Sequence, residues 1–216
     1  MRKSLSGTLM MAAAAALSAQ EPALPQTASE SVEPPPAPNF LIVVADDMGW
    51  SDIGVLGGEI RTPTLDALAR EGTVMTQFYV APTCSPTRSM LMTGLDNHPA
   101  GVGTMHSLAA PNQTGRNYAA QLHDDVVTMA EALGTRGYET LMSGKWHLAI
   151  DEAQRPHNRG FDRSFSLLTG GASHFADQRW LNPTEEVVYL EDGEPATLPA
   201  DFYSSINYTD KLLAYL

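Results

Sequence analysis

The amino-acid sequence predicts an α/β fold, in which a sheet with parallel strands is flanked by helices. Phe40 to Ala45 form a continuous apolar, β-branched run that stops at Asp46-Asp47, as is typical of a strand buried on both faces. A helix and then a strand are predicted in succession between residues 128 and 143. Polar residues follow both predicted strands, at the place where ligands bind in open α/β sheets.

After the first predicted strand, a helix is predicted to begin at Thr62-Pro63, with Thr62 as the N-cap and the proline at the first helical position. The helix is expected to end near Gly72 and to turn three apolar residues inward: Leu65, Leu68 and Ala69. Residues 76–80 are then predicted to form a second strand.

A capping box, Thr128-x-x-Glu131, predicts the start of another helix, which is expected to stop at Gly137. Tyr138 to Ser143 follow as a predicted strand, which leads into Gly144-Lys145-Trp146-His147. This order of helix, strand and polar strand end is the α/β pattern.

The last part of the chain predicts a hairpin and a helix. Residues 187–190 and 194–198 flank Asp192-Gly193, a typical hairpin turn. Residues 209–216 are predicted to be helical with Thr209 as the cap, and they end on apolar residues without a stop signal. We therefore expect this chain to be a truncated part of a longer one.

Composition and the N-terminus indicate which binding partners are excluded and where the protein is located. The net charge of −12 over 216 residues argues against binding to nucleic acid or to an anionic membrane surface. Residues 1–19 resemble a signal peptide, with basic Arg2 and Lys3, a short apolar stretch and a small-residue cleavage site near Ser18 or Ala19. No cysteine lies near that site, which excludes a lipoprotein anchor, so a periplasmic or secreted protein is expected.

Residues 20–38 are rich in Pro, Ser, Ala and Glu, and they are predicted to form an extended linker before the folded part at 39–216. The folded part contains the chain's only cysteine, Cys84, so no internal disulfide can form. An unpaired thiol in an exported protein suggests a chemical role.

Cys84 begins the run Cys84-Ser85-Pro86-Thr87-Arg88, which continues through an apolar segment to Thr93-Gly94. Pro86 favours a helix start, which places Cys84 at a helix N-terminus, where exposed amides attract anions. Residues alone leave two other interpretations open. A lone cysteine can be a small buried apolar residue, or an unmodified thiolate nucleophile of lowered pKa.

The full Cys-x-Pro-x-Arg-x-x-Leu-Met-Thr-Gly run resembles the signature of the type I sulfatases, whose fold is that of alkaline phosphatase and its relatives. The resemblance implies that a maturation enzyme converts Cys84 to formylglycine. The hydrated aldehyde has two hydroxyls on one carbon. One attacks the sulfur of a sulfate ester and displaces the alcohol or phenol. The other, once deprotonated, reforms the aldehyde and expels sulfate. It also implies that Arg88, one turn along the helix, points its guanidinium at the modified side chain and at sulfate.

Asp46 and Asp47 resemble the metal-binding opening of the same family, and with position 84 they are the implied ligands of Ca²⁺ or Mg²⁺. Oxygen ligands suit Ca²⁺, which takes about six to eight of them. Asp52, in the same segment, is interpreted as a structural or turn residue.

Gly137 to Leu148 resemble the second sulfatase signature. The resemblance implies that Lys145 is a cation for sulfate and that His147 is the base that drives sulfate expulsion. Because the two residues are two apart, an extended backbone would put both on one side. The segment around His174 resembles the family position that protonates the leaving group or binds sulfate.

The sequence therefore predicts the N-terminal part of a calcium-dependent sulfuric ester hydrolase acting on aryl sulfates. The family completes its metal site with an Asp-Asn or Asp-His pair and another lysine from a C-terminal half that this chain lacks. Two alternatives stay open: a phosphonate or phosphodiester hydrolase with the same formylglycine motif, and a catalytically inactive fragment.

Overall fold

The computed structural model describes residues 37–177 and 186–216. The chain divides into two compact units, residues 1–43 and 44–216. The predicted signal peptide and almost all of the predicted linker lie outside the described residues. None of the described helices has the length and the apolar content that a bilayer crossing requires.

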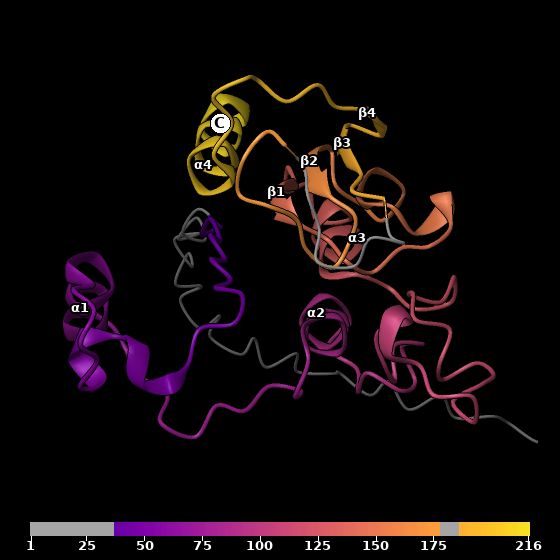
Figure 1. Cartoon of the computed structure of the whole chain (residues 1–216), viewed down its shortest axis with the longest axis horizontal. Coiled ribbons are helices and arrows are strands. Elements are labelled where there is room, and N and C mark those ends of the chain that lie inside the picture. Colours follow the sequence, from indigo (N-terminus) through magenta and orange to yellow (C-terminus); the bar gives the residue numbers. More distant parts are fainter. Residues whose placement is uncertain (1–36, 178–185) are drawn as a thin grey trace, which may run out of the picture. The chain divides into compact units, whose positions relative to one another are not determined.

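The regular elements of the described ranges are α-helices, short 3-10 helices (η) and strands (Figure 1). The α-helices are α1 (Pro63–Glu71), α2 (Cys84–Thr93), α3 (Met129–Gly134) and α4 (Ser204–Tyr215). The strands are β1 (Leu141–Lys145), β2 (Arg163–Leu167), β3 (Tyr189–Glu191) and β4 (Glu194–Pro195). The 3-10 helices are η1 (Trp50–Asp52), η2 (Gly54–Leu56), η3 (His106–Leu108), η4 (Glu152–Gln154) and η5 (Pro156–Asn158).

The four strands form one mixed sheet in the order β1-β2-β3-β4. β1 and β2 are parallel, with Leu141 beside Arg163 and Lys145 beside Leu167, whereas β2–β3 and β3–β4 are antiparallel. The predicted hairpin is confirmed, although its strands are shorter than expected. Asp192 and Gly193 both have positive φ, 50° and 93°, as a tight hairpin turn requires.

Two predicted strands are absent from the described residues. Residues 40–45 and 76–80 are without regular structure, and the side chains of Leu41, Val43 and Tyr79 are 75–80% exposed. An apolar, β-branched run becomes a strand only when a neighbouring strand pairs with its N–H and C=O groups. The described sheet offers these two runs no such neighbour.

Helix α1 has the predicted bounds, with Thr62 at the N-cap, Pro63 at the first position and Gly72 after the end. The prediction that its apolar residues face inward was wrong, because no residue of α1 is buried and Leu68 is 61% exposed.

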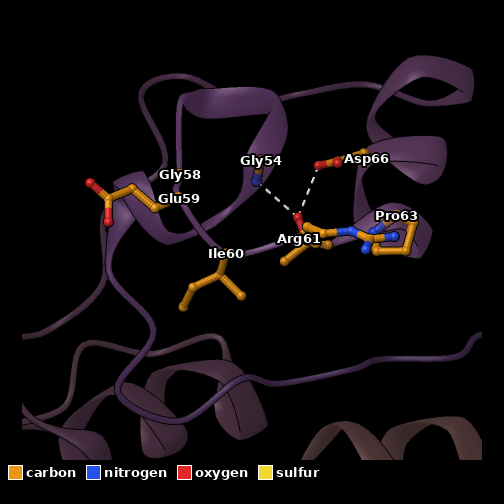
Figure 2. Close-up of a pocket in the computed structure, with 8 residues that line it drawn as sticks. Gly54, Gly58, Glu59, Ile60, Arg61, Pro63 and Asp66 are labelled. Carbon is orange, nitrogen blue, oxygen red and sulfur yellow. Dashed lines mark hydrogen bonds between the residues drawn. The ribbon is translucent and has the colours of Figure 1, made fainter.

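The hydroxyl of Thr62 does not cap the helix. It donates to Asp66 at 2.9 Å and accepts from the Gly54 N–H at 2.8 Å. These bonds border an open pocket of about 270 Å³ (Figure 2).

Helix α3 confirms the predicted capping box, since Thr128 Oγ1 accepts from the Glu131 N–H at 3.1 Å and Glu131 accepts from the Thr128 N–H at 2.7 Å. The helix ends at Gly134, before Gly137, and the strand begins at Leu141 rather than Tyr138. A turn occupies residues 135–137, and residues 138–140 are without regular structure.

Helix α4 begins at Ser204, so the prediction that Thr209 caps it was wrong. Thr209 lies inside the helix, and its hydroxyl donates to the Ser205 carbonyl at 2.8 Å. Helix α4 packs against β1 and β2, which explains why tertiary contacts extend it beyond the local cap signal.

Buried apolar side chains form two clusters. Trp146 and Leu148, which follow β1, belong to the first cluster, and the second lies between β2, β3 and α4. The first contains Ala100, Val102, Leu122, Val126, Trp146 and Leu148, and the second contains Phe165, Leu167, Tyr189 and Phe202.

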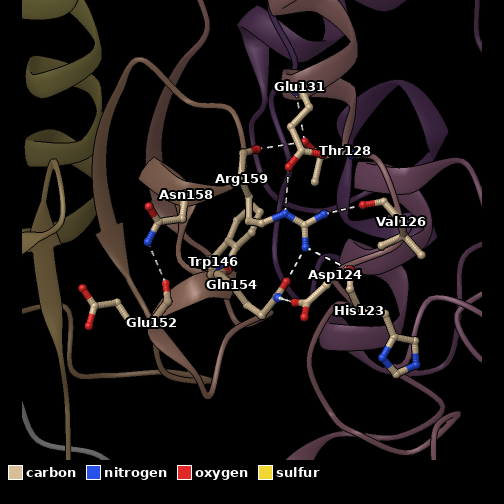
Figure 3. Close-up of polar contacts among 10 residues, drawn as sticks. All are labelled: His123, Asp124, Val126, Thr128, Glu131, Trp146, Glu152, Gln154, Asn158 and Arg159. Carbon is tan, nitrogen blue, oxygen red and sulfur yellow. Dashed lines mark hydrogen bonds and ion pairs between the residues drawn. The ribbon is translucent and has the colours of Figure 1, made fainter.

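A buried arginine joins the loop before α3 to the segment that follows β1 (Figure 3). Arg159 is 4% exposed, and its guanidinium donates to Glu131 at 2.9 Å, to the Val126 carbonyl at 2.6 Å and to the His123 carbonyl at 3.2 Å. It also donates to the side chain of Gln154. Each of the three guanidinium nitrogens thus donates at least one hydrogen bond, which offsets the cost of burying the charge.

Candidate active site

Helix α2 presents Cys84 as its first residue, which confirms the prediction that Cys84 lies at a helix N-terminus. Thr83 is the N-cap, and Gly94, with φ of 67°, ends the helix. Ser85, Pro86 and Ser89 are buried, whereas Cys84 is only half-buried. The thiol is therefore fixed by a buried helix face while it stays accessible.

The thiol of Cys84 meets His147, a residue that lies far away in the sequence. Its Sγ lies 3.4 Å from His147 Nδ1 and 3.4 Å from Met105 Sδ. His147 follows β1 and has φ of 57°. The expected extended backbone is thus wrong at His147, where a left-handed turn directs the ring towards Cys84.

Two cations and one carboxylate lie beside this pair. Lys145 Nζ contacts Asp46 Oδ2 at 2.7 Å, and Arg88 Nη2 lies 3.4 Å from Asp46 Oδ1. The side chains of Lys145 and Arg88 are 11% and 13% exposed. Two largely buried positive charges face one carboxylate, which leaves a net positive charge that suits an anion.

The surroundings shift two pKa values in the cluster. Burial, followed by the charges of Lys145 and Arg88, lowers the pKa of His147 to about 4, against the opposing charge of Asp46. At neutral pH the imidazole is therefore uncharged and can accept a proton. Burial acts to raise the pKa of Asp46, but the hydrogen bond and charge of Lys145, and then the charge of Arg88, hold it below its ordinary value.

Helix α2 also binds the backbone of the segment after β1. Arg88 Nη1 donates to the Lys145 carbonyl at 2.6 Å, and Ser85 Oγ donates to the His147 carbonyl at 2.9 Å. Among the described residues, Arg88 Nε is buried and has no hydrogen-bond partner. One donor of the guanidinium is thus left for another acceptor.

Of the predicted site residues, Asp46, Cys84, Arg88, Lys145 and His147 come together. Within the described ranges, no hydrogen bond joins His174 to them; its Nδ1 lies 2.6 Å from Ser204 Oγ and its ring stacks on Tyr203. Within the described ranges, no hydrogen bond or ion pair joins Asp47, whose φ is 61°, to the cluster. The pocket beside α1 contains none of these residues.

The described residues do not by themselves form a complete cation site. Within residues 37–177 and 186–216, no group of three His, Cys, Asp or Glu side chains is placed to hold a metal ion. Asp46 and Asp47 supply carboxylate oxygens of the kind that Ca²⁺ prefers, but two carboxylates are too few for its coordination sphere.

Two residues at the site were not predicted from the sequence. Met105 lies in a segment without any motif, so only the fold brings it to Cys84. Ser85 lies within the cysteine motif, but its bond to a carbonyl 62 residues away has no sequence signal. Trp146, between Lys145 and His147, is 2% exposed and belongs to the first buried cluster.

Asp52 accepts from the Gly49 N–H at 2.7 Å. This bond agrees with its interpretation as a turn residue.

Comparison with known proteins points to one family. The family model described as Sulfatase matches residues 38–216. The arylsulfatase of Klebsiella aerogenes is 44% identical over 182 residues, which are 83% of this chain and 39% of the relative. The chain thus spans about two-fifths of the length of that relative.

Solved structures share the fold, which confirms the predicted fold class. The crystal structure of Ps i-CgsB matches with a TM-score of 0.63 and 28% identity, covering 80% of this chain and 41% of that one. The PsFucS1 sulfatase from Pseudoalteromonas sp. matches with a TM-score of 0.58 and 24% identity, covering 80% and 39%.

Proposed function

This chain belongs to the sulfatase family, and we propose that it carries the nucleophile side of an active site that hydrolyses sulfate monoesters, with aryl sulfates as the substrate class. The observation that carries the proposal is the contact of Cys84 Sγ with His147 Nδ1 at 3.4 Å, beside the largely buried Arg88 and Lys145. Attack on a sulfate ester requires a nucleophile, a base and positive charge for the sulfate oxygens. The thiol position, the neutral imidazole and the two cations supply these three.

In the proposed reaction, residue 84 acts as the hydrate of a formylglycine derived from Cys84. One hydroxyl attacks the sulfur and displaces the alcohol or phenol of the ester. The other hydroxyl, once deprotonated, collapses to the aldehyde and breaks the carbon–oxygen bond to sulfate, which leaves. His147 accepts a proton at Nδ1, which faces residue 84. Lys145 and Arg88 hold the sulfate oxygens, and the unpartnered Arg88 Nε is the donor that supports this role. Fixed donors stabilise developing negative charge without reorganisation.

We propose that Ca²⁺ or Mg²⁺ binds Asp46, Asp47 and residue 84 in the complete protein. Asp46 forms ion pairs with Lys145 and Arg88, which belong to the cluster around Cys84. The remaining oxygen ligands would come from outside the described residues. Calorimetric titration of the full-length protein with Ca²⁺ tests this site, and Asp46→Asn is expected to weaken binding.

Replacement of Cys84 tests the nucleophile. In the full-length protein, Cys84→Ala is expected to abolish hydrolysis of an aryl sulfate, and Cys84→Ser is expected to stop after one attack, because serine lacks the second hydroxyl. Arg116→Ala is the control, since Arg116 is exposed and pairs with the exposed Asp125. Normal turnover by Cys84→Ala would refute the proposal.

Mass spectrometry of the peptide around residue 84 tests the modification. An active protein is expected to carry an aldehyde there, formed by a maturation enzyme in the producing cell. An unmodified thiol in an active protein would favour the cysteine nucleophile instead.

We also propose that the protein is exported to the periplasm or secreted, without a stable membrane anchor. The basic residues and the apolar stretch within residues 1–19 support this location, because they resemble a signal peptide. N-terminal sequencing of the mature protein should find a start near Ser18 or Ala19, whereas an intact Met1 would contradict it.

A further inference from the structure

The backbone at His147 is held in a conformation that histidine rarely adopts. Its φ of 57° lies in the left-handed region, which costs a non-glycine residue free energy unless the surroundings impose it. The conformation matters because it directs Nδ1 to within 3.4 Å of Cys84 Sγ. Relaxation to a negative φ would turn the imidazole away from residue 84.

The residues on either side of His147 are fixed by the fold. The Trp146 N–H donates to the Leu167 carbonyl at 2.8 Å, and the Leu148 carbonyl accepts from the Leu122 N–H at 3.2 Å. Both flanking side chains are in the core, with Trp146 2% exposed and Leu148 0% exposed. The carbonyl of His147, between these two anchored residues, takes a hydrogen-bond partner of its own.

Ser85 provides that partner. Its side chain is 1% exposed, and its hydroxyl donates to the His147 carbonyl at 2.9 Å. Because Ser85 follows Cys84 in the same helix, the bond joins the nucleophile's helix directly to the base's backbone. Removal of the hydroxyl would leave the half-buried His147 carbonyl without this donor, which weakens the hold on its backbone.

Gly170 limits the ring from another side. A Cβ atom at Gly170 would lie 2.8 Å from His147 Cε1 and 2.9 Å from Nε2, so the glycine backbone lies against the edge of the imidazole. The ring is thereby confined between Gly170 and Cys84 Sγ.

From these contacts we infer that Ser85 is a positioning residue, which holds the left-handed backbone of His147 and so keeps the imidazole directed at residue 84. The inference rests on the proposed function for its effect on turnover. Ser85 does not touch the sulfate ester in this role; it acts through His147.

The kinetic test uses the full-length protein with Ser85→Ala and the matched control Ser89→Ala. Ser89 is also fully buried in α2, but its hydroxyl donates to Pro86 within the helix at 2.8 Å. Turnover of an aryl sulfate is divided by the fraction of residue 84 present as aldehyde, measured by mass spectrometry. This division removes any effect of Ser85→Ala on maturation.

We expect Ser85→Ala to lower kcat by about 10- to 100-fold, the scale of a small misplacement of a catalytic group, with KM nearly unchanged. Ser89→Ala should keep the kcat of the parent protein. An equal kcat in all three proteins, or an equal fall in both variants, would overturn the inference.

A second readout does not depend on activity. With ¹⁵N-labelled histidine, the ring signals of His147, assigned through His147→Gln, should shift in Ser85→Ala and stay in place in Ser89→Ala. Unshifted His147 signals in Ser85→Ala would overturn the positioning role. Absence of sulfate ester hydrolysis by the parent protein would refute the proposed function alone, because the ring signals still test Ser85.

Discussion

Replacement of Arg159 by alanine should cost this protein a large part of its stability. The guanidinium is 4% exposed and donates to Glu131, to Gln154 and to the carbonyls of Val126 and His123. Its loss would leave the buried Val126 carbonyl and the Gln154 side-chain oxygen without this donor and would also leave a cavity.

The expected loss in free energy of unfolding follows from this geometry. Removal of one partner of a buried ion pair costs about 3–5 kcal/mol. Glu131 is 31% exposed and can turn towards water, so the lower end, about 3 kcal/mol, applies here. That loss is a large share of a typical stability of about 5–15 kcal/mol.

Urea unfolding of the full-length protein measures the loss, with Arg116→Ala as the control. Arg116 also forms an ion pair, with Asp125 at 2.6 Å, but the two side chains are 59% and 65% exposed. Because water and salt screen this pair, its removal should change the midpoint far less. Equal midpoints for Arg159→Ala and Arg116→Ala would refute the argument from burial.

Three further predictions follow from single contacts. Burial acts to raise the pKa of Glu131, but its bonds with Arg159 and Thr128 hold the pKa below its ordinary value. The stabilisation that results is present above the unfolded-state pKa and is lost as the pH falls through the lower folded-state pKa. Glu131→Gln should therefore flatten the acid limb of stability against pH, and an unchanged limb would contradict this. Gly170→Ala should lower kcat, because the new Cβ would lie 2.8 Å from the His147 ring, and a parent-like kcat would show that the ring has room. Gly193→Ala should lower the free energy of unfolding by about 1 kcal/mol or more, because φ at this position is 93°. An unchanged midpoint in thermal unfolding would argue against a strained turn.

The local features of this chain could be predicted because neighbouring residues determine them. The capping box at Thr128, the hairpin turn at Asp192-Gly193 and the position of Cys84 at the start of α2 all depend on residues a few positions apart. Side-chain capping and positive φ at glycine act within a single turn. The family motifs likewise brought Arg88 and Lys145 into the predicted site.

The strand predictions at 40–45 and 76–80 failed because a strand requires hydrogen-bonding partners from elsewhere in the chain. The same reason explains the inward face wrongly assigned to α1: an apolar residue such as Leu68 is buried only where another element covers it. An apolar pattern shows which side chains a segment could bury. It does not show which other element of the fold, if any, packs over them.

The amino-acid sequence was enough to predict the chemical groups of the site: one thiol at a helix start, cations at fixed spacing and a base two residues after Lys145. The contact of Cys84 with His147, across 63 residues, is visible only in the folded chain, where a left-handed backbone bound by Ser85 produces it. Bonds between distant segments depend on how the core places β1 beside α2. No local preference of the chain encodes that placement, because each backbone conformation there is selected by partners that folding brings together.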